Sequence, residues 1–167
     1  MAATVSILEA NGAGETETAS ITNTNMGSTD AVNLDPVAYP VTPGANTYEK
    51  WQKFNCTNLG ASSQLDTFRV WRVGALGGSA THVTNARTSS YAGAETYATP
   101  IATASSVATQ AMPTSDPAAA NVGVGGSLAG TITGVAKSDY VVHQIQTDAG
   151  DTAGSTSTMH YAYREIA

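Results

Sequence analysis

Apolar and polar residues alternate along much of this chain, in short runs that Gly, Pro and Asn residues interrupt. Near the start, Val5 and Ile7 alternate with Thr4 and Ser6. A period of two places one set of side chains on each face of a strand, so it predicts half-buried β-strands. Strands are predicted at residues 3–8, 18–24, 48–58, 65–73, 82–88, 96–103, 127–135, 139–147 and 157–166.

This succession of elements indicates the fold class. Strands do not alternate with amphipathic helices, so a parallel sheet is not expected. About eight or nine short strands with turn signals between them are typical of an antiparallel β-sandwich, of jelly-roll or immunoglobulin-like type. The 167 residues suit one domain. We therefore predict an all-β chain with a single sandwich domain over 1–167.

Two segments interrupt the strand pattern. Residues 31–47 contain three prolines, which lack the N–H that a central strand needs, so this segment is expected to be loop or sheet edge. Residues 104–126 are rich in Ala, Ser and Gly. Within them, 104–112 could be irregular or a short helix, because its apolar residues fall at helical spacing while its Ser and Thr content disfavours a helix. Both segments, 31–47 and 104–126, are candidate extended arms that partner subunits would order.

The aromatic residues indicate where the core lies. Both Trp and both Phe residues fall in the predicted strands 48–58 and 65–73, which the connection 60–63 would join as a hairpin. Buried aromatics contribute a large packing area. The candidate core residues are Trp51, Phe54, Phe68, Val70, Trp71, Val142, Ile145 and Tyr161.

The last two predicted strands suggest a second hairpin. If it is symmetric about its loop, Thr147 pairs with Thr156 and His143 lies opposite His160. Two imidazoles at cross-strand distance can ligate a metal. No acid or Cys shares their predicted face, so two polar residues on a sheet surface are expected instead.

Charge is scarce and unevenly distributed. Charged residues make up 12% of the chain and the net charge is −6, so a nucleic-acid partner is not expected. Residues 1–49 hold six acids and no Lys or Arg, whereas 50–90 hold five basic residues and one acid. The asymmetry indicates either a contact between neighbouring subunits or ordinary solvated charges. The candidate subunit-contact residues are Lys50, Lys53, Arg69, Arg72, Glu15 and Glu17.

Motifs for catalysis or cofactor binding are missing from the sequence. Cys56, the single cysteine, lies in an apolar strand, where a small buried hydrophobe is expected. No nucleophile-elbow, Walker or dinucleotide-binding pattern occurs, and Asp148 and Asp151 do not match a calcium loop. No apolar run is long enough to span a membrane. We therefore predict a non-enzymatic protein with no catalytic residues, no cofactor, no metal and no membrane partner.

Five stretches resemble small virion proteins of tailed bacteriophages. The stretches are Thr29-Asp-Ala-Val-Asn-Leu34, Tyr48-Glu-Lys-Trp-Gln-Lys53, Phe68-Arg-Val-Trp71, Ser138-Asp-Tyr-Val-Val-His-Gln-Ile-Gln146 and Tyr161-Ala-Tyr163. The resemblance covers most of the chain and consists of strand patterns. It implies a β-sandwich subunit that is made in the host cytoplasm and assembled on the particle without catalysis.

These observations lead to one main functional expectation and two alternatives. The main one is a capsid decoration or cement protein, forming symmetric homo-oligomers on the lattice of the major capsid protein. A tail or adaptor component is the structural alternative. A carbohydrate- or receptor-binding module is an alternative from another class, for which Tyr39, Tyr91 and Tyr97 are the candidate exposed aromatics.

Overall fold

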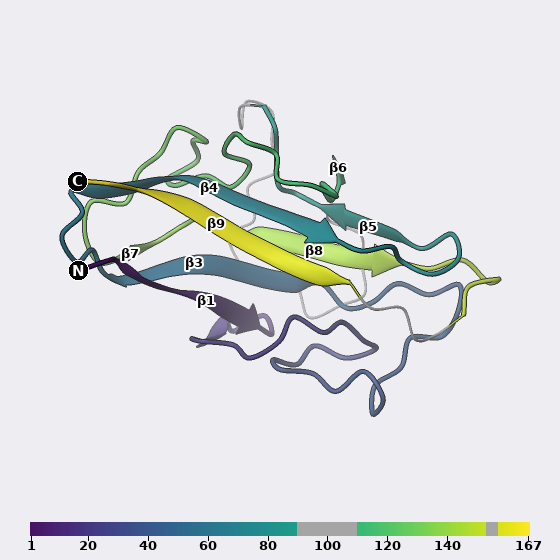
Figure 1. The fold of residues 1–167 in the computed structure, drawn as a ribbon. Coiled ribbons are helices and arrows are strands. Elements are labelled where there is room, and N and C mark those ends of the chain that lie inside the picture. The colour runs from purple at the N-terminus through teal and green to yellow at the C-terminus, as the bar shows by residue number, and fades with distance from the viewer. Residues whose placement is uncertain (90–109, 153–156) are drawn as a thin grey trace.

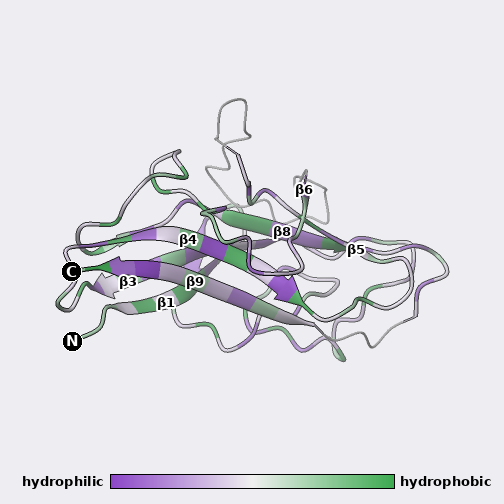
Figure 2. Cartoon of the chain, turned by 45° about the horizontal axis from the view of Figure 1, so that its top comes forward, coloured by the Kyte–Doolittle hydropathy of each residue, from purple (hydrophilic) through white to green (hydrophobic). Residues whose placement is uncertain are grey.

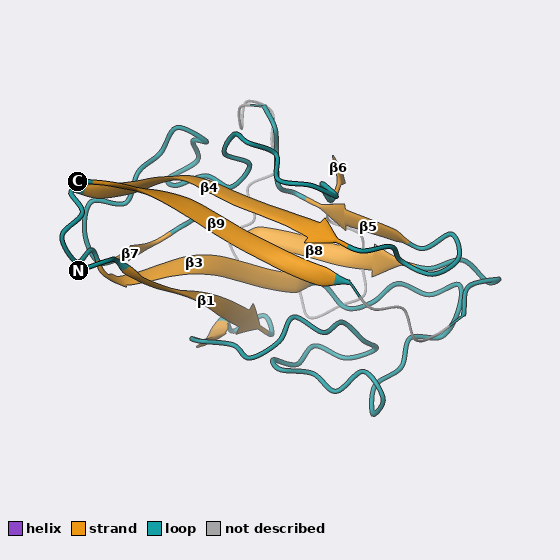
Figure 3. Cartoon of the chain, viewed as in Figure 1, coloured by secondary structure: helices purple, strands orange, loops and turns teal. Residues whose placement is uncertain are grey.

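The computed structural model describes residues 1–89, 110–152 and 157–167 (Figure 1). In these ranges the chain consists of strands, turns and loops, and no helix is present (Figure 3). The strands are β1 (Thr4–Asn11), β2 (Thr16–Thr18), β3 (Lys50–Asn58), β4 (Gln64–Val73), β5 (Thr81–Thr84), β6 (Gln110–Ala111), β7 (Ala136–Lys137), β8 (Val141–Gln146) and β9 (Thr158–Ile166).

Two antiparallel sheets build the fold. Within the described residues, the larger sheet has the order β2-β1-β3-β8-β5-β6, with β7 also paired to β3, and the smaller sheet consists of β4 and β9. In Figure 1 β4 and β9 pass in front of β3 and β8. The prediction of an all-β antiparallel sandwich with about nine strands is confirmed.

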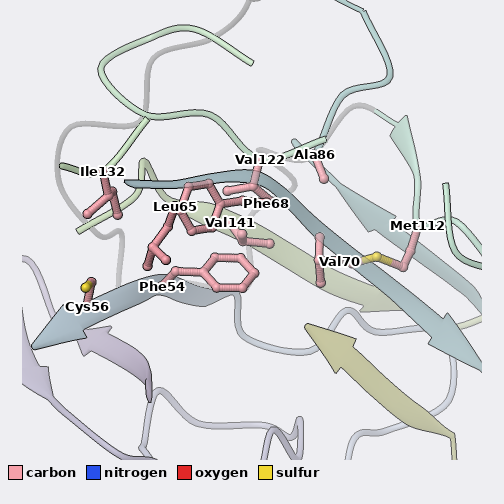
Figure 4. Packing of buried hydrophobic residues seen from close by; sticks show 10 residues of the cluster. All are labelled: Phe54, Cys56, Leu65, Phe68, Val70, Ala86, Met112, Val122, Ile132 and Val141. Carbon is pink, nitrogen blue, oxygen red and sulfur yellow. The ribbon is translucent and has the colours of Figure 1, made fainter. Parts of the chain in front are cut away.

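The main hydrophobic core lies between the two sheets. Phe54 of β3 faces Phe68 of β4 with ring centroids 5.1 Å apart (Figure 4). Tyr161 of β9 packs against Phe54 with ring centroids 6.0 Å apart. Inward side chains of both sheets thus meet in one cluster. Its buried members are Phe54, Cys56, Leu65, Phe68, Val70, Ala86, Met112, Val122, Ile132 and Val141.

Two of the candidate core residues belong to a second, smaller cluster. Trp51 and Val142 are cross-strand partners, and they are buried together with Ala10 and Tyr140. Trp51 is separated from Phe54 by an odd number of positions along β3, so its side chain lies on the opposite face of the larger sheet. The larger sheet therefore buries apolar residues on both faces.

The prediction that Trp71 lies in the core is wrong. On β4, Val70 and Arg72 point inward and are buried, so the side chain between them points outward. The half-buried Trp71 ring stacks on His160 of β9, with centroids 5.1 Å apart and planes 10° apart. Ile145 is likewise only half-buried and lies outside both clusters, whereas the partly buried Tyr161 packs against the main one.

The predicted hairpin of residues 48–58 and 65–73 is wrong. β3 and β4 belong to different sheets, and the connection between them crosses from one sheet to the other. Their aromatic faces pack against each other across the sandwich instead of lying side by side in one sheet. At the crossing, Gly60 adopts φ +64, and a Cβ there would meet the Met1 carbonyl oxygen at 2.2 Å, so only glycine fits.

The second predicted hairpin is wrong for the same reason. β8 lies in the larger sheet between β3 and β5, whereas β9 pairs with β4. His143 is therefore opposite Lys50 and Thr84, and His160 is opposite Trp71. The proposed His143–His160 pair does not form.

Five further expected elements differ from the structure or lie outside it, in whole or in part. Residues 127–135 form turns with isolated bridges instead of a strand, in a stretch where glycines are frequent. The strands expected at 18–24 and 82–88 are replaced by the shorter β2 and β5. The strand expected at 96–103 lies outside the described residues. Of the possible helix at 104–112, residues 110–112 are described, and 110–111 form β6.

The described parts of the two candidate arms pack on their own sandwich. In 31–47, Leu34 is buried, and Thr47 N–H donates to the Ile145 carbonyl at 2.9 Å. In 110–126, Met112, Asn121 and Val122 are buried. These contacts attach part of each segment to the chain's own sandwich, and whether partner subunits order the segments stays a prediction.

Candidate functional site

One end of the space between the sheets is lined by polar side chains. Direct cross-strand partners share a face of a sheet. Glu9 of β1 is opposite Gln52 of β3, and Lys50 of β3 is opposite His143 of β8, all on the face that carries Phe54. β5 contributes His82. We call Glu9, Lys50, Gln52, His82 and His143 the polar cluster; each is at most 5% exposed.

Hydrogen bonds join the polar cluster into one chain. Gln52 Nε2 donates to Glu9 Oε2 at 3.1 Å, which leaves Gln52 Oε1 as the acceptor for His143 Nε2 at 3.0 Å. Because His143 Nε2 then carries the proton, its Nδ1 accepts from His82 Nε2 at 2.8 Å. Tyr161 of β9 donates its hydroxyl proton to Gln52 Oε1 at 2.5 Å. The network thus assigns both imidazoles as neutral tautomers protonated at Nε2.

Lys50 and Glu9 form a buried ion pair at one end of this chain. Their Nζ and Oε1 atoms are 2.7 Å apart, and the side chains are 3% and 0% exposed. Lys50 also donates to the Ala31 carbonyl at 2.5 Å, and Asn11 Nδ2 donates to Glu9 Oε1 at 3.2 Å. Such additional hydrogen bonds are what a buried ion pair needs to offset its desolvation. A carboxylate held in this way is not accessible to a dissolved substrate.

The surroundings of the two histidines favour their neutral forms. Burial lowers the pKa of His82 to about 4, and the charge of Arg72 adds to the effect. Burial also holds the pKa of His143 well below its ordinary value, with further contributions from His82 and Lys50. His82 Nδ1 has no hydrogen-bond partner among the described residues, as fits an unprotonated ring nitrogen. Both rings are therefore uncharged near neutral pH.

Sequence reasoning missed the polar cluster because it joined the wrong strands. It paired His143 with His160, whereas the structure pairs His143 with His82, 61 positions away. A usable signal was present, since Lys50 and His143 occupy positions where alternation with Phe54 and Val141 predicts an inward side chain. Ionisable residues at inward positions of strong strands indicate buried partners.

The acidic and basic residues predicted to meet between subunits contact each other within the chain. Lys53 Nζ lies 3.4 Å from Glu15 Oε1 and 3.7 Å from Glu17 Oε1. Glu17 also pairs with Lys137, and Glu15 accepts a hydrogen bond from the Tyr140 hydroxyl. Interaction with Tyr140 and then with Lys53 keeps the pKa of Glu15 below its ordinary value despite desolvation. The predicted complementarity is therefore satisfied intramolecularly.

The other three candidate contact residues are also engaged within the chain. Lys50 is buried against Glu9. Arg72 is 9% exposed and donates to the Gly74 carbonyl. Arg69 Nη1 lies 2.6 Å from Asp116 Oδ1. Because Lys50 and Arg72 are buried, the prediction that they form a subunit contact is wrong.

The smaller sheet has one edge that the rest of the chain covers. Along β4, Leu65 exchanges both backbone hydrogen bonds with Ile132 at 2.9 Å. Val70 N–H donates to Asn121 Oδ1, and Asn121 Nδ2 donates to the Val70 carbonyl, both at 2.8 Å. Arg72 N–H donates to the Pro113 carbonyl at 2.8 Å. Residues 113–132 thus occupy this edge.

The opposite edge of the smaller sheet, along β9, is open in the part of the chain that the structure describes. Tyr161 is directly opposite Val70, whose backbone groups point away from β9, so the N–H and C=O of Tyr161 point away from β4. By alternation, the backbone groups of Met159 and Tyr163 do the same. None of the three makes a backbone hydrogen bond to a described residue on that side.

A groove of about 560 Å³ runs beside this open edge. Its walls are Ser6 and Ile7 of β1, the segment 20–25, and residues at the start of β9 that include Met159 and Tyr161. No described residue lining it carries a charge. The groove therefore combines unpaired strand backbone with a neutral, largely Ser-, Thr- and Asn-containing wall.

Other groups considered as reactive are engaged or buried. Cys56 is 0% exposed. The Asp151 carboxylate accepts hydrogen bonds from Ser79 N–H at 2.6 Å and Asp148 N–H at 2.8 Å. Within the described ranges no group of three or more His, Cys, Asp or Glu residues is placed to hold a metal ion. None of the described segments is a helix long and apolar enough to cross a membrane.

Comparison with protein-family models, curated proteins and solved structures found no match to this chain.

Proposed function

We propose that this protein is a non-enzymatic structural subunit of a bacteriophage virion, and most specifically a capsid decoration protein. In this role it binds the major capsid protein and stabilises contacts between capsid subunits, as a homo-oligomer on the capsid lattice. The site of action is the virion surface. Binding through backbone and side-chain contacts is then its whole mechanism.

The open edge of β9 is the observation that carries this proposal. An exposed strand edge is a ready-made template for pairing with another chain, and monomeric proteins usually protect it. Here the β4 edge is protected by residues 113–132, whereas the β9 edge is left open beside a groove. The biological setting is proposed from the resemblance of the sequence to small virion proteins of tailed bacteriophages. The ionisable groups of the interior bind each other, which favours a structural role over a catalytic one.

The test is to locate the chain in particles and to measure its effect on them. Purified protein is added to phage heads assembled without it, and the temperature at which the heads disassemble is recorded. We expect the protein to co-purify with heads and to raise that temperature. Co-purification with detached tails would support the tail or adaptor alternative. Absence of the chain from all particle fractions would contradict a virion role.

A carbohydrate- or receptor-binding module is the alternative function from another class. Tyr39 is 47% exposed and lies near Val37, which is 87% exposed, so this loop offers an accessible apolar surface. Tyr91 and Tyr97 lie outside the described residues. Glycan-array binding by the isolated chain, lost on Tyr39→Ala, would favour this alternative.

A further inference from the structure

The free backbone groups of β9 define a strand-sized acceptor. Met159, Tyr161 and Tyr163 present their N–H and C=O groups on the same side of the strand. Four residue steps separate the first from the last, a length of about 13 Å at about 3.3 Å per residue. A segment of about five residues, in extended conformation, can therefore pair with all three.

We propose that the groove beside β9 is a docking site for one extended, uncharged segment of another virion subunit, which adds to β9 as a strand. The identity of the partner rests on the proposed function, whereas the docking geometry rests on the open edge alone. Main-chain hydrogen bonds would supply affinity, and the groove wall would select the side chains.

The neutral wall of the groove determines the chemistry of the segment. A charged side chain brought into the groove would lose hydration without meeting a countercharge, which is unfavourable. Alternate side chains of an added strand point to one face, toward the interior near Ile7, Met159 and Tyr161. Small or apolar residues at those positions, with Ser or Thr between them, fit this environment.

The arrangement of the groove walls favours a single strand over the β9 strand of a second copy. Residues 20–25 form the wall opposite β9, and β9 of another copy would bring β4 attached along its far edge. The other open-edged strands of a second copy fit poorly as well. β2 carries Glu17, β7 carries Lys137 and β6 has two residues.

Residue-resolved hydrogen–deuterium exchange tests the pairing directly. In the free protein, the amides of Met159 and Tyr161 should exchange faster than those of His160 and Ala162, which bond to β4. The probe is the capped peptide acetyl-Thr-Val-Thr-Val-Thr-Val-Thr-amide. We expect it to slow exchange at the first two amides by about tenfold or more. The same peptide with Lys in place of its central Val should bind at least about tenfold more weakly.

A matched pair of variants separates the groove from the rest of the surface. Thr22→Lys places a charge on the exposed groove wall and keeps the backbone N–H that donates to Asn33 Oδ1. Thr81→Lys makes the same change at an exposed position of β5 outside the groove. We expect Thr22→Lys to weaken peptide binding by about tenfold or more and Thr81→Lys to leave it unchanged.

Several results would overturn the docking proposal. One is that Thr22→Lys and Thr81→Lys bind the peptide equally well. Another is that the Lys-containing peptide binds as tightly as the original peptide. A third is that the peptide slows amide exchange only in a strand other than β9. Concentration-dependent self-association that Thr22→Lys abolishes would instead assign the groove to a second copy. If heads bind wild type and Thr22→Lys equally, the docking site is wrong and the virion role stands. If the protein binds the peptide but does not bind heads, the docking site stands and the virion role is wrong.

Discussion

The two ends of the space between the sheets are built on the same strands but have opposite chemistry. β3 presents Phe54 and Cys56 at one end and Lys50 and Gln52 at the other, all on one face. Figure 2 shows the change along β8, whose hydrophobic beginning is followed by a hydrophilic stretch that contains His143. One strand therefore contributes to both an apolar core and a polar cluster.

The difference lies in what each end requires of its neighbours. Apolar side chains gain stability from burial in proportion to area and need no particular partner. Each group of the polar cluster needs a partner at hydrogen-bond distance, since an unpaired buried polar group is costly. The stability of the folded protein should therefore depend more strongly on single substitutions and on pH at the polar end than at the apolar end. A second substitution at the polar end should restore part of the stability that the first one removes.

Breaking the Lys50–Glu9 pair should give the largest effect. Lys50→Met leaves the buried Glu9 carboxylate without its countercharge, and we expect a loss of about 3–5 kcal/mol in the free energy of unfolding. Replacing both residues by Met removes the uncompensated charge, so the double variant should be more stable than Lys50→Met. Urea denaturation of the three proteins measures this. A double variant less stable than the single one would refute the interpretation.

Leu65→Ala probes the apolar end. Leu65 is 0% exposed in the main core, and its truncation should cost about 2–5 kcal/mol through lost burial and a residual cavity. No second charge change should restore this loss, and the loss should be the same at about pH 7.5 and pH 5, because no titrating group is removed. Denaturation midpoints at the two pH values check both statements.

Acid should destabilise the polar end through its histidines. The folded-state pKa of His82 is lowered to about 4 from the ordinary 6.5, so the unfolded chain binds more protons between these values. Stability is full above about pH 6.5, falls as pH falls, and levels off below about pH 4. His82 alone should account for about 2 kcal/mol of loss between about pH 7.5 and pH 5. His143, whose pKa is also lowered, adds to it in the same direction.

The control for this pH dependence is the Leu65→Ala protein. Its stability curve should run parallel to that of wild type, because its polar cluster is intact. His82→Gln should flatten the curve between about pH 6.5 and pH 5. Glu9, Lys50, Arg72 and Tyr161 are the other ionisable groups near the two rings. An unchanged slope in His82→Gln would show that this histidine does not cause the acid sensitivity.

The smallest expected effect concerns the irregularity in β4. The register between β4 and β9 shifts between Asp66 and Arg69, and Thr67 adopts φ +53 there, a conformation that β-branched residues rarely occupy. Thr67→Gly should stabilise the folded protein by up to about 1 kcal/mol, because glycine adopts positive φ without strain. Thr67→Val is the matched control and should not stabilise. The thermal midpoints of the two variants provide the measurement.

The strands themselves were largely predictable, and their pairing was not. Alternation located β1, β3, β4, β8 and β9 to within a few residues. Both predicted hairpins failed, because loops that looked suited to tight turns carry the chain from one sheet to the other. Residues 127–135 also alternate, yet they remain irregular where glycines weaken a strand.

The site was less predictable than the fold. The buried aromatic pair of Phe54 and Phe68 followed from composition and alternation. The His82–His143 contact did not, because it depends on β8 lying between β3 and β5. The open edge of β9 was equally invisible, since it exists because, within residues 1–89, 110–152 and 157–167, β4 is the one strand paired to β9 and residues 113–132 cover the far side of β4.

By itself, the sequence determined the all-β class and the alternation of side chains between the two faces of its strong strands, but it assigned Trp71, Lys50 and Arg72 to the wrong faces. It could determine the alternation because a period of two is a local property of an extended backbone. Only the tertiary structure decided which strands pair, which edge stays open and which buried polar groups meet. Those depend on contacts between residues far apart in the chain, and alternation alone assigns a residue to a face without assigning the strand its neighbours.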